Sequence, residues 1–231
     1  MKAADLVKTN VAYHNELNAK AWDNGQLRPE VRQRLLQIAT IFIDYLDIPN
    51  FDALDIVLTG SIANYNYTKY SDFDLHVVTR YSDLRCDDLA EAFYRAKKEV
   101  WNNQHDIMIR GHEVELYVED VEQPPVSGGV YSVVNDRWIK KPSYNPPRID
   151  DRAVNDKAND LIQRITKAIA SDDTADIERL RAKIRNMRRS GLDTAGEFGV
   201  ENLAFKIVRN LGYLDKLSKA YTQQQDRDLS L

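Results

Sequence analysis

Two short polar segments have a spacing that would suit the binding of phosphates and a metal ion. Gly60-Ser61 directly follows residues 55–58, a run typical of a short buried strand. After ten intervening residues come Asp72 and Asp74, which are one residue apart. A glycine lets backbone N–H groups approach a phosphate closely, and paired carboxylates bind divalent cations. The pattern therefore predicts a site for a metal-bound nucleoside triphosphate, with Gly60 and Ser61 on its phosphates.

The residues after Gly60-Ser61 should strengthen this site. Residues 62–64 are expected to form a small helix, entered through the Gly-Ser turn. The start of a helix presents unpaired N–H donors and a partial positive charge, and both attract phosphate oxygens.

Residues 72–77 alternate between polar and apolar side chains, which predicts a half-buried strand. Two carboxylates on one face would stand about 6.5 Å apart at their Cα atoms, a span suited to two cations about 3.5–4 Å apart. His76 would either orient Asp74 or serve as a structural histidine. Core-facing members would be Phe73, Leu75 and Val77, and members of the other face Asp72, Asp74 and His76.

A third acid would complete a metal site if it lay on a neighbouring strand. Residues 105–109 and 112–118 have the pattern of two strands joined at Arg110-Gly111. On the second of these, Glu115 has apolar neighbours on both sides, as Asp74 does, and it is the preferred third ligand. Glu113 lies on the same face and remains the alternative.

These motifs resemble the signature of the DNA-polymerase-β-like nucleotidyltransferase superfamily. The likeness rests on Gly60-Ser61, on Asp72 and Asp74 after ten intervening residues, and on the apolar-Glu115-apolar strand. It extends to a group of predicted nucleotidyltransferases encoded largely by bacteriophages. Segments that carry this second likeness are 58–76, 101–117, 129–142 and 196–213. The superfamily tolerates Glu in place of Asp at the third position.

The resemblance implies a fold, a reaction and further site residues. It implies an α+β fold with a mixed β-sheet core, and a Mg²⁺- or Mn²⁺-dependent transfer of NMP from an NTP. Asp72, Asp74 and Glu115 would be the catalytic metal ligands, while Gly60, Ser61 and Ser71 would bind the nucleotide. A helical lobe would face the catalytic sheet and contact the triphosphate through basic residues. Candidates for these contacts are Lys206 and Arg209.

Periodicity and turn residues divide the chain into a mixed part, residues 1–150, and a helical part, residues 151–231. The N-terminal helices should pack on the sheet. A hairpin is expected from 130–134 and 137–140, inside a segment rich in proline and glycine that begins at Gln123-Pro124-Pro125. A frayed tail is expected over 223–228. Helices are expected at 4–22, 29–47, 87–101, 153–171, 174–190 and 199–220.

Composition narrows the classes of protein to consider. The chain has 231 residues, of which 43% are hydrophobic and 29% charged, as in an ordinary soluble globular protein. A single cysteine, Cys86, excludes an intramolecular disulfide and a cysteine-based zinc cluster. No apolar run approaches the length of a membrane span, and residues 1–8 lack the apolar core of a signal peptide. We therefore expect a cytoplasmic protein, in the host cytoplasm if it is phage-encoded, with no membrane partner.

A formal charge of −4 argues against a nucleic-acid-binding surface over the whole chain. Locally, six of the eleven residues 179–189 are basic and none is acidic, while apolar residues recur at helical spacing. This segment is a solvated basic face, or it guides RNA or the triphosphate. The tyrosines of residues 64–70 would stack on a base or cover the sheet edge.

The sequence thus predicts a nucleotidyltransferase that esterifies an acceptor hydroxyl and releases pyrophosphate. Its substrate would be an NTP, and the acceptor remains open between RNA, a nucleotide, a small molecule and a protein side chain. The alternative is a non-catalytic nucleotide-binding module with a regulatory or antitoxin-like role. Oligomeric state and base preference do not follow from the sequence.

Overall fold

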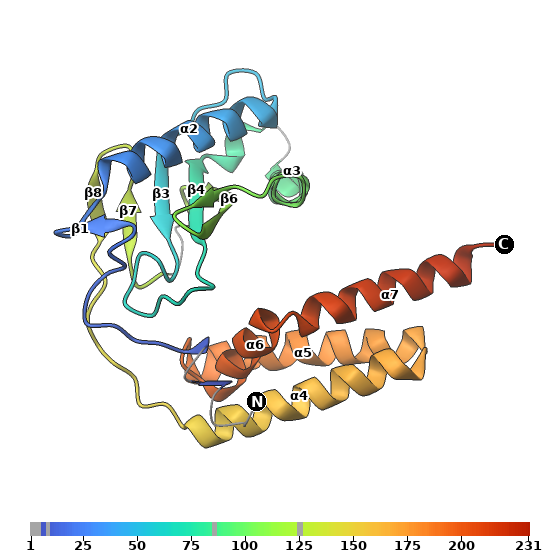
Figure 1. The fold of residues 1–231 in the computed structure, drawn as a ribbon. Coiled ribbons are helices and arrows are strands. Elements are labelled where there is room, and N and C mark those ends of the chain that lie inside the picture. Colours follow the sequence, from blue (N-terminus) through green and yellow to red (C-terminus); the bar gives the residue numbers. More distant parts are fainter. Residues whose placement is uncertain (1–5, 8–9, 85–86, 124–126) are drawn as a thin grey trace. The chain divides into compact units, whose positions relative to one another are not determined.

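The computed structural model describes residues 6–7, 10–84, 87–123 and 127–231. Cys86 and Pro124-Pro125, on which two of the expectations above rest, lie outside these ranges. The chain divides into two compact units (Figure 1). We call residues 13–145 the sheet unit, and residues 1–12 together with 146–231 the helical unit.

The sheet unit is built on a six-stranded mixed sheet with the order β5-β6-β4-β3-β7-β8. Strands β4 and β6 are parallel, and the other neighbouring pairs are antiparallel. This confirms the predicted α+β fold with a mixed sheet. Its elements are β1 Trp22–Asp23, β2 Gln26–Leu27, α2 Pro29–Leu46, β3 Asp55–Thr59, β4 Phe73–Thr79, a 3₁₀ turn Tyr81–Asp83, α3 Asp87–Gln104, β5 Met108–Ile109, β6 His112–Asp120, β7 Val130–Ser132 and β8 Arg137–Lys140.

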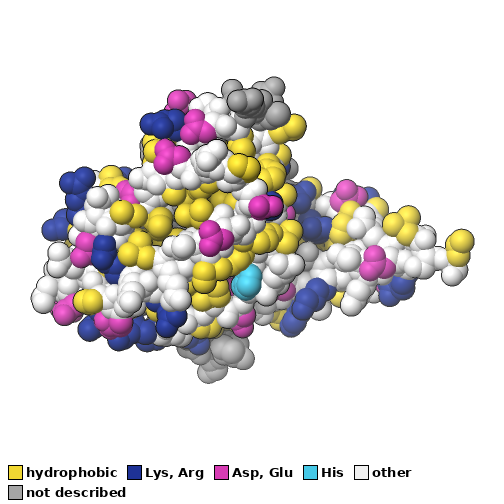
Figure 2. Space-filling model, turned by 90° about the horizontal axis from the view of Figure 1, so that it is seen from above, with side chains coloured by type: hydrophobic (Ala, Val, Ile, Leu, Met, Phe, Trp, Pro, Cys, Tyr) yellow, Lys and Arg dark blue, Asp and Glu magenta, His cyan; other side chains and the backbone are white. Residues whose placement is uncertain are grey.

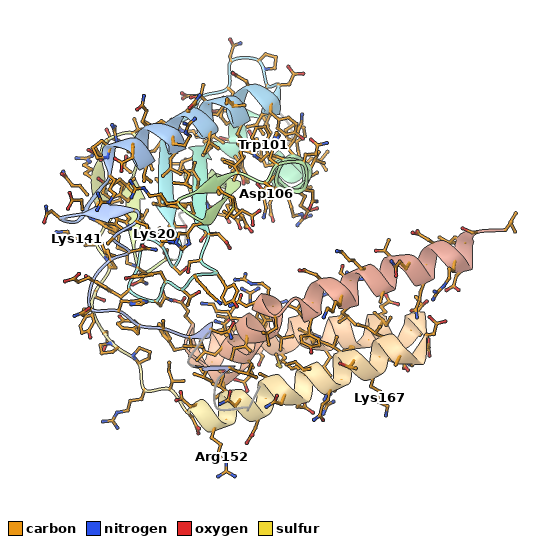
Figure 3. All side chains as sticks on the ribbon, viewed as in Figure 1. Lys20, Trp101, Asp106, Lys141, Arg152 and Lys167 are labelled. Atoms are coloured by element: carbon orange, nitrogen blue, oxygen red, sulfur yellow. The ribbon has the colours of Figure 1, made fainter. Side chains whose placement is uncertain are left out.

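The predicted two faces of β4 are confirmed, because its core-facing side chains are fully buried. Helices α2 and α3 supply the other side of this core, and α2 lies across the sheet (Figure 1). Trp101 of α3 packs edge-on against Phe42 of α2, with ring centroids 5.4 Å apart (Figure 3). Pro29 starts α2 with its φ already suited to a helix, and Asp47 ends it in the left-handed conformation. One face of β4 thus packs into this core, and its polar side chains lie on the opposite face of the sheet.

The N-terminal helix predicted over residues 4–22 is wrong for most of its length. Residues 6–7 and 10 are helical, whereas residues 11–18 form no regular element. Trp22 then begins a short hairpin, β1–β2, whose turn is Asn24-Gly25. Both turn residues have positive φ, 49° and 80°, as a two-residue hairpin turn requires. This local turn outweighs the helical spacing of the apolar residues before it.

Two other elements of the sheet unit differ from the prediction only in length. The strand predicted over 105–109 pairs only at Met108–Ile109, and Arg110-Gly111 joins it to β6 as expected. The predicted hairpin of residues 130–140 is confirmed as β7 and β8, with a shorter first strand.

The helical unit consists of α4 Asp151–Ser171, α5 Thr174–Ala195, α6 Val200–Asn210 and α7 Tyr213–Leu229. The single helix expected over 199–220 is wrong, because Gly212 takes a positive φ of 74° and separates α6 from α7. Residues 223–228, expected to fray, lie inside α7. Within them Gln224 is buried and donates a 2.8 Å hydrogen bond to Asp172.

The surface carries charges of both signs. On the face shown in Figure 2, Lys and Arg side chains lie among Asp and Glu side chains, in keeping with the small net charge. Among the helices of the described residues, none combines the length and the apolar character needed to cross a membrane.

Candidate active site

The register of β4 and β6 brings the predicted acids together. In this parallel pair Asp74 lies directly beside Glu115, and neighbouring strands run about 4.8 Å apart. Asp72 immediately precedes β4 and is two residues from Asp74. Glu113 instead stands beside Met108 of β5. The register thus sets Glu115 beside Asp74, and the choice of Glu115 over Glu113 as the third acid stays a prediction.

Gly60 is required by its contact with Asp74. Its φ is +74°, and a Cβ at this position would lie 1.7 Å from Oδ2 of Asp74. The carboxylate group thus packs directly against the Cα of Gly60, 14 residues earlier in the chain. Asp74 also pairs with Thr59, at the end of β3, in the antiparallel ladder. A glycine is needed here for a close approach and for a left-handed backbone at once.

The small helix expected after Gly60-Ser61 is wrong, because these residues form turns. The amide N–H of Asn64 donates to the carbonyl of Ser61 at 3.1 Å, which closes a tight turn. Trp22 Nε1 donates to the carbonyl of Ile62 at 2.8 Å, so a side chain uses an acceptor that a helix would need. Gly129 packs so closely that a Cβ there would lie 1.9 Å from the carbonyl oxygen of Ala63. The helix-dipole argument for phosphate binding therefore does not apply here.

Ser71 connects the turn to the acids. Its hydroxyl accepts a 2.7 Å hydrogen bond from Ser61 Oγ and a 2.8 Å bond from the amide of Thr68. Ser71 itself is buried. In this structure its hydroxyl holds the loop that enters β4, and its direct contact with a nucleotide remains a prediction.

His112, at the start of β6, binds the backbone of the same loop. Its Nδ1 donates to the carbonyl of Ser71 at 2.6 Å, and its Nε2 accepts from the amide of Asn18 at 3.2 Å. Burial lowers the pKa of His112. The hydrogen bond to Ser71 acts in the opposite direction, and the nearby positive charge of Lys20 lowers the pKa further. His112 is thus a buried histidine that anchors the entry to β4 on β6.

Tyr117, two residues after Glu115 on the same face of β6, contacts the third acid. Its hydroxyl donates a hydrogen bond to Oε2 of Glu115. One face of its ring stacks on His76 at a centroid distance of 4.6 Å, and the ammonium of Lys98 lies 4.1 Å from the ring centroid. The alternation of side chains along β6 puts Tyr117 on the face of Glu115, and the sequence alone gives it no role.

His76 has the structural role that was one of its two alternatives. Its Nδ1 lies 2.9 Å from Oε2 of Glu119, and its Nε2 lies 3.2 Å from Oγ1 of Thr59. These partners come from β6 and β3, on either side of β4. His76 therefore ties three strands together beside the acids.

The acids impose a negative potential on their surroundings. Burial raises the pKa of Tyr117, and the charges of Asp74, Glu115 and Asp72 raise it further. Burial also raises the pKa of Glu113, with Glu115 and Asp106 contributing. Tyr117 thus lies in the negative field of these three carboxylates.

This set of donors fits a hard divalent cation. Carboxylate oxygens are the ligands that Mg²⁺ and Mn²⁺ prefer, and adjacent carboxylates are best balanced by cations. In the described part of the chain, however, no group of three or more His, Cys, Asp and Glu side chains stands ready to hold a metal ion. A cation held by all three acids would therefore require a change of rotamer in at least one of these side chains.

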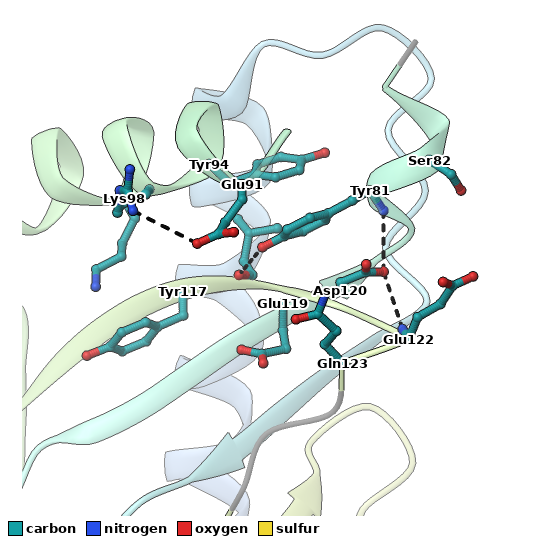
Figure 4. A pocket seen from close by; sticks show the side chains of 12 residues that line it. Tyr81, Ser82, Glu91, Tyr94, Lys98, Tyr117, Glu119, Asp120, Glu122 and Gln123 are labelled. Atoms are coloured by element: carbon teal, nitrogen blue, oxygen red, sulfur yellow. Dashed lines mark hydrogen bonds and ion pairs between the residues drawn. The ribbon is translucent and has the colours of Figure 1, made fainter. Parts of the chain in front are cut away.

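A cavity of about 460 Å³ lies next to Tyr117, between α3 and the second half of β6 (Figure 4). Its size is in the range of small-molecule sites. Three tyrosines line it, together with acidic and basic side chains. Among the lining residues are Tyr81, Tyr94, Tyr117, Glu119, Lys98 and Arg95.

The basic candidates of the helical unit have local partners or are exposed. Lys206 forms a 3.0 Å ion pair with Glu197, and Arg209 is exposed on α6. Both belong to the other unit, so their contact with a triphosphate remains a prediction.

The basic segment 179–189 lies on α5, and part of it serves packing within the helical unit. The guanidinium of Arg181 lies 4.3 Å from the ring centroid of Tyr221, and that of Arg188 lies 4.3 Å from the ring centroid of Phe205. These two contacts give Arg181 and Arg188 a role in packing, which was neither of the two interpretations of the segment. Exposed basic residues of the segment are Arg179, Lys183, Arg185 and Arg189.

No protein-family model and no curated protein matches the sequence. Among solved structures, the chain is similar to a STING-associated CdnE c-di-GMP synthase from Capnocytophaga granulosa. The two share 14% sequence identity over 87% of this chain and 84% of that chain, with a TM-score of 0.21. A TM-score this low carries no argument about fold or function.

Proposed function

We propose that this protein is a metal-dependent nucleotidyltransferase that transfers NMP from an NTP to an acceptor hydroxyl and releases pyrophosphate. The observation that supports this most is the parallel register that sets Asp74 beside Glu115, with Asp72 two residues away. Asp74 of β4, Glu115 of β6 and Asp72 just before β4 lie next to a glycine turn, and the packing of the core does not require acids at these positions. Like charges at this spacing destabilise the sheet unless a cation balances them.

The side chains would divide the work as follows. Asp72 and Asp74 would hold the divalent cation on the triphosphate side, and Glu115 would hold it on the acceptor side. When bound, Mg²⁺ or Mn²⁺ lowers the pKa of the acceptor hydroxyl and neutralises the leaving pyrophosphate. Backbone N–H groups at Gly60 and Ser61 orient the phosphates, so that the acceptor oxygen attacks in line.

A thermal-shift experiment tests the binding half of this proposal. Mg²⁺ with a non-hydrolysable NTP should raise the melting temperature of the wild-type protein, since a ligand that binds only the folded state stabilises it by about 2.7 kcal/mol at a hundred times its Kd. Asp74→Asn should lose this shift. Asp44→Asn changes an exposed aspartate on α2 and should keep it. An equal shift in all three proteins would place the metal elsewhere and contradict the proposal.

A further inference from the structure

The bond from Tyr117 to Glu115, one of the candidate metal ligands, has no explanation in the packing of the sheet. The ring alone would fill its place between His76 and Lys98. The hydroxyl group, however, reaches Oε2 of Glu115, two residues back on the same strand. Residues i and i+2 of a strand point to the same side, so this bond closes over the outer face of the sheet.

A single bond from Tyr117 leaves Glu115 able to bind a cation. A carboxylate has two oxygens with about four lone-pair positions, and a phenol donates only one hydrogen. The terminal torsion of a glutamate is otherwise broad, with no preferred staggered state. One bond to Oε2 therefore sets the rotation of the carboxylate while leaving its other oxygen available.

The ring that carries this hydroxyl is itself held from two sides. His76 stacks on it at an interplanar angle of 12°, and His76 is in turn fixed by Glu119 and Thr59. The ammonium of Lys98 lies over the ring at 4.1 Å from its centroid. A phenol with so little rotational freedom is suited to orienting another group, since a positioning residue must be locked by its own neighbours.

We propose that Tyr117 is a positioning residue, which fixes the carboxylate of Glu115 in the orientation that binds the divalent cation. This inference rests on the proposed function, because it assigns a purpose to a residue beside that same site. It adds a fourth side chain to the site, one that touches neither the cation nor the nucleotide.

Tyr117→Phe tests the proposal, because it keeps the ring and removes only the hydroxyl. Mn²⁺ affinity is measured from the electron paramagnetic resonance signal of free Mn²⁺, which needs no catalytic turnover. Loss of a group that orients a metal ligand typically weakens metal affinity by about 10–100-fold, and this is the expected result. Tyr81→Phe is the matched control, since Tyr81 lines the same cavity but donates to the carbonyl of Val118 at 2.9 Å. It should leave Mn²⁺ affinity unchanged.

A double-mutant cycle separates positioning from an indirect effect on the fold. If Tyr117 acts through Glu115, adding Tyr117→Phe to a Glu115→Gln protein should change Mn²⁺ affinity no further. Mn²⁺ binding should also perturb the ultraviolet absorbance of tyrosine in the wild-type protein, a measurement that does not depend on the folding of a variant. The Tyr81→Phe protein should show the perturbation as strongly as the wild type.

The outcomes distinguish this proposal from the proposed function. If the wild-type protein binds Mn²⁺, Asp74→Asn abolishes binding and Tyr117→Phe keeps it, the metal site stands and the role of Tyr117 is refuted. An additive effect in the cycle, or Mn²⁺ binding without a tyrosine signal, also refutes it. If the wild-type protein shows no Mn²⁺ binding that depends on Asp74, the proposed function fails and the role of Tyr117 fails with it.

Discussion

Gly60→Ala should separate the backbone role of this glycine from its role beside Asp74. The added methyl group would lie 1.7 Å from Oδ2 of Asp74, whereas real Cβ contacts essentially never fall below 3.0 Å. The carboxylate must therefore retreat by more than about 1 Å, well beyond the tolerance of about 0.5 Å within which site residues must be held. Because it is the end of a flexible side chain, it can move at little cost to stability.

The expected loss of stability comes from the backbone. Alanine at a φ of +74° costs about 1–2 kcal/mol relative to a right-handed conformation, which corresponds to a fall in Tm of about 3–10 °C for a unit of this size. Metal affinity should fall more steeply, by about 10-fold or more, because a displaced carboxylate no longer meets the cation. Thermal unfolding followed by circular dichroism measures the first effect, and Mn²⁺ titration the second.

Gly25→Ala provides the matched control. Gly25 also has a positive φ, +80°, but a Cβ there would have nothing within 4 Å. The two variants should lose similar stability, while only Gly60→Ala loses Mn²⁺ affinity. Equal Mn²⁺ affinities in the two variants would refute the reasoning that the contact between Gly60 and Asp74 serves a metal site.

Two further predictions concern the supports of the two units. Burial lowers the pKa of His112 below its ordinary 6.5, and its Nε2 already faces the side-chain amide of Asn18. Below about pH 6.5 the unfolded chain therefore binds a proton at this residue more readily than the folded chain does. Urea denaturation should give a free energy of unfolding that falls as the pH drops below about 6.5, and that falls less steeply in His112→Gln. A pH dependence unchanged by this substitution would contradict that account. Arg188→Ala should destabilise the helical unit by about 1 kcal/mol, because the guanidinium of Arg188 lies over the ring of Phe205. Arg185 is exposed on the same helix, and Arg185→Ala should change the stability by less than about 0.5 kcal/mol. Equal effects of the two substitutions on Tm would refute this distinction.

The sequence predicted best those elements whose signal is periodic. Alternation located β4 and β6 and both their faces, and the apolar neighbours of Glu115 selected the acid that the register sets beside Asp74. Such patterns show which side of an element is buried, because the side chains that pack into the core must be apolar. The arrangement of the acids followed from it.

What the sequence did not predict depends on contacts between distant residues. Nothing local reveals that Gly60 is needed by Asp74, or that Trp22 uses the carbonyl of Ile62 and so leaves a turn in place of a helix. In the hairpin after Trp22, by contrast, the signal was present: Asn24-Gly25 is a strong hairpin turn, and the apolar spacing before it misled. Gly212 likewise marked the break between α6 and α7.

Transfer of label from each α-³²P-labelled NTP tests the central claim most directly. The wild-type protein is incubated with Mg²⁺ or Mn²⁺, alone and with RNA, small-molecule and protein acceptor pools, and both pyrophosphate release and labelled products are followed. We predict that at least one pool becomes labelled with release of pyrophosphate, and that Asp72→Ala combined with Asp74→Ala abolishes both. Release of pyrophosphate that persists in the double variant, or none from the wild-type protein with any NTP and pool, would contradict the assignment as a nucleotidyltransferase. The second result, together with NTP binding that depends on Asp74, would instead support a non-catalytic nucleotide-binding module.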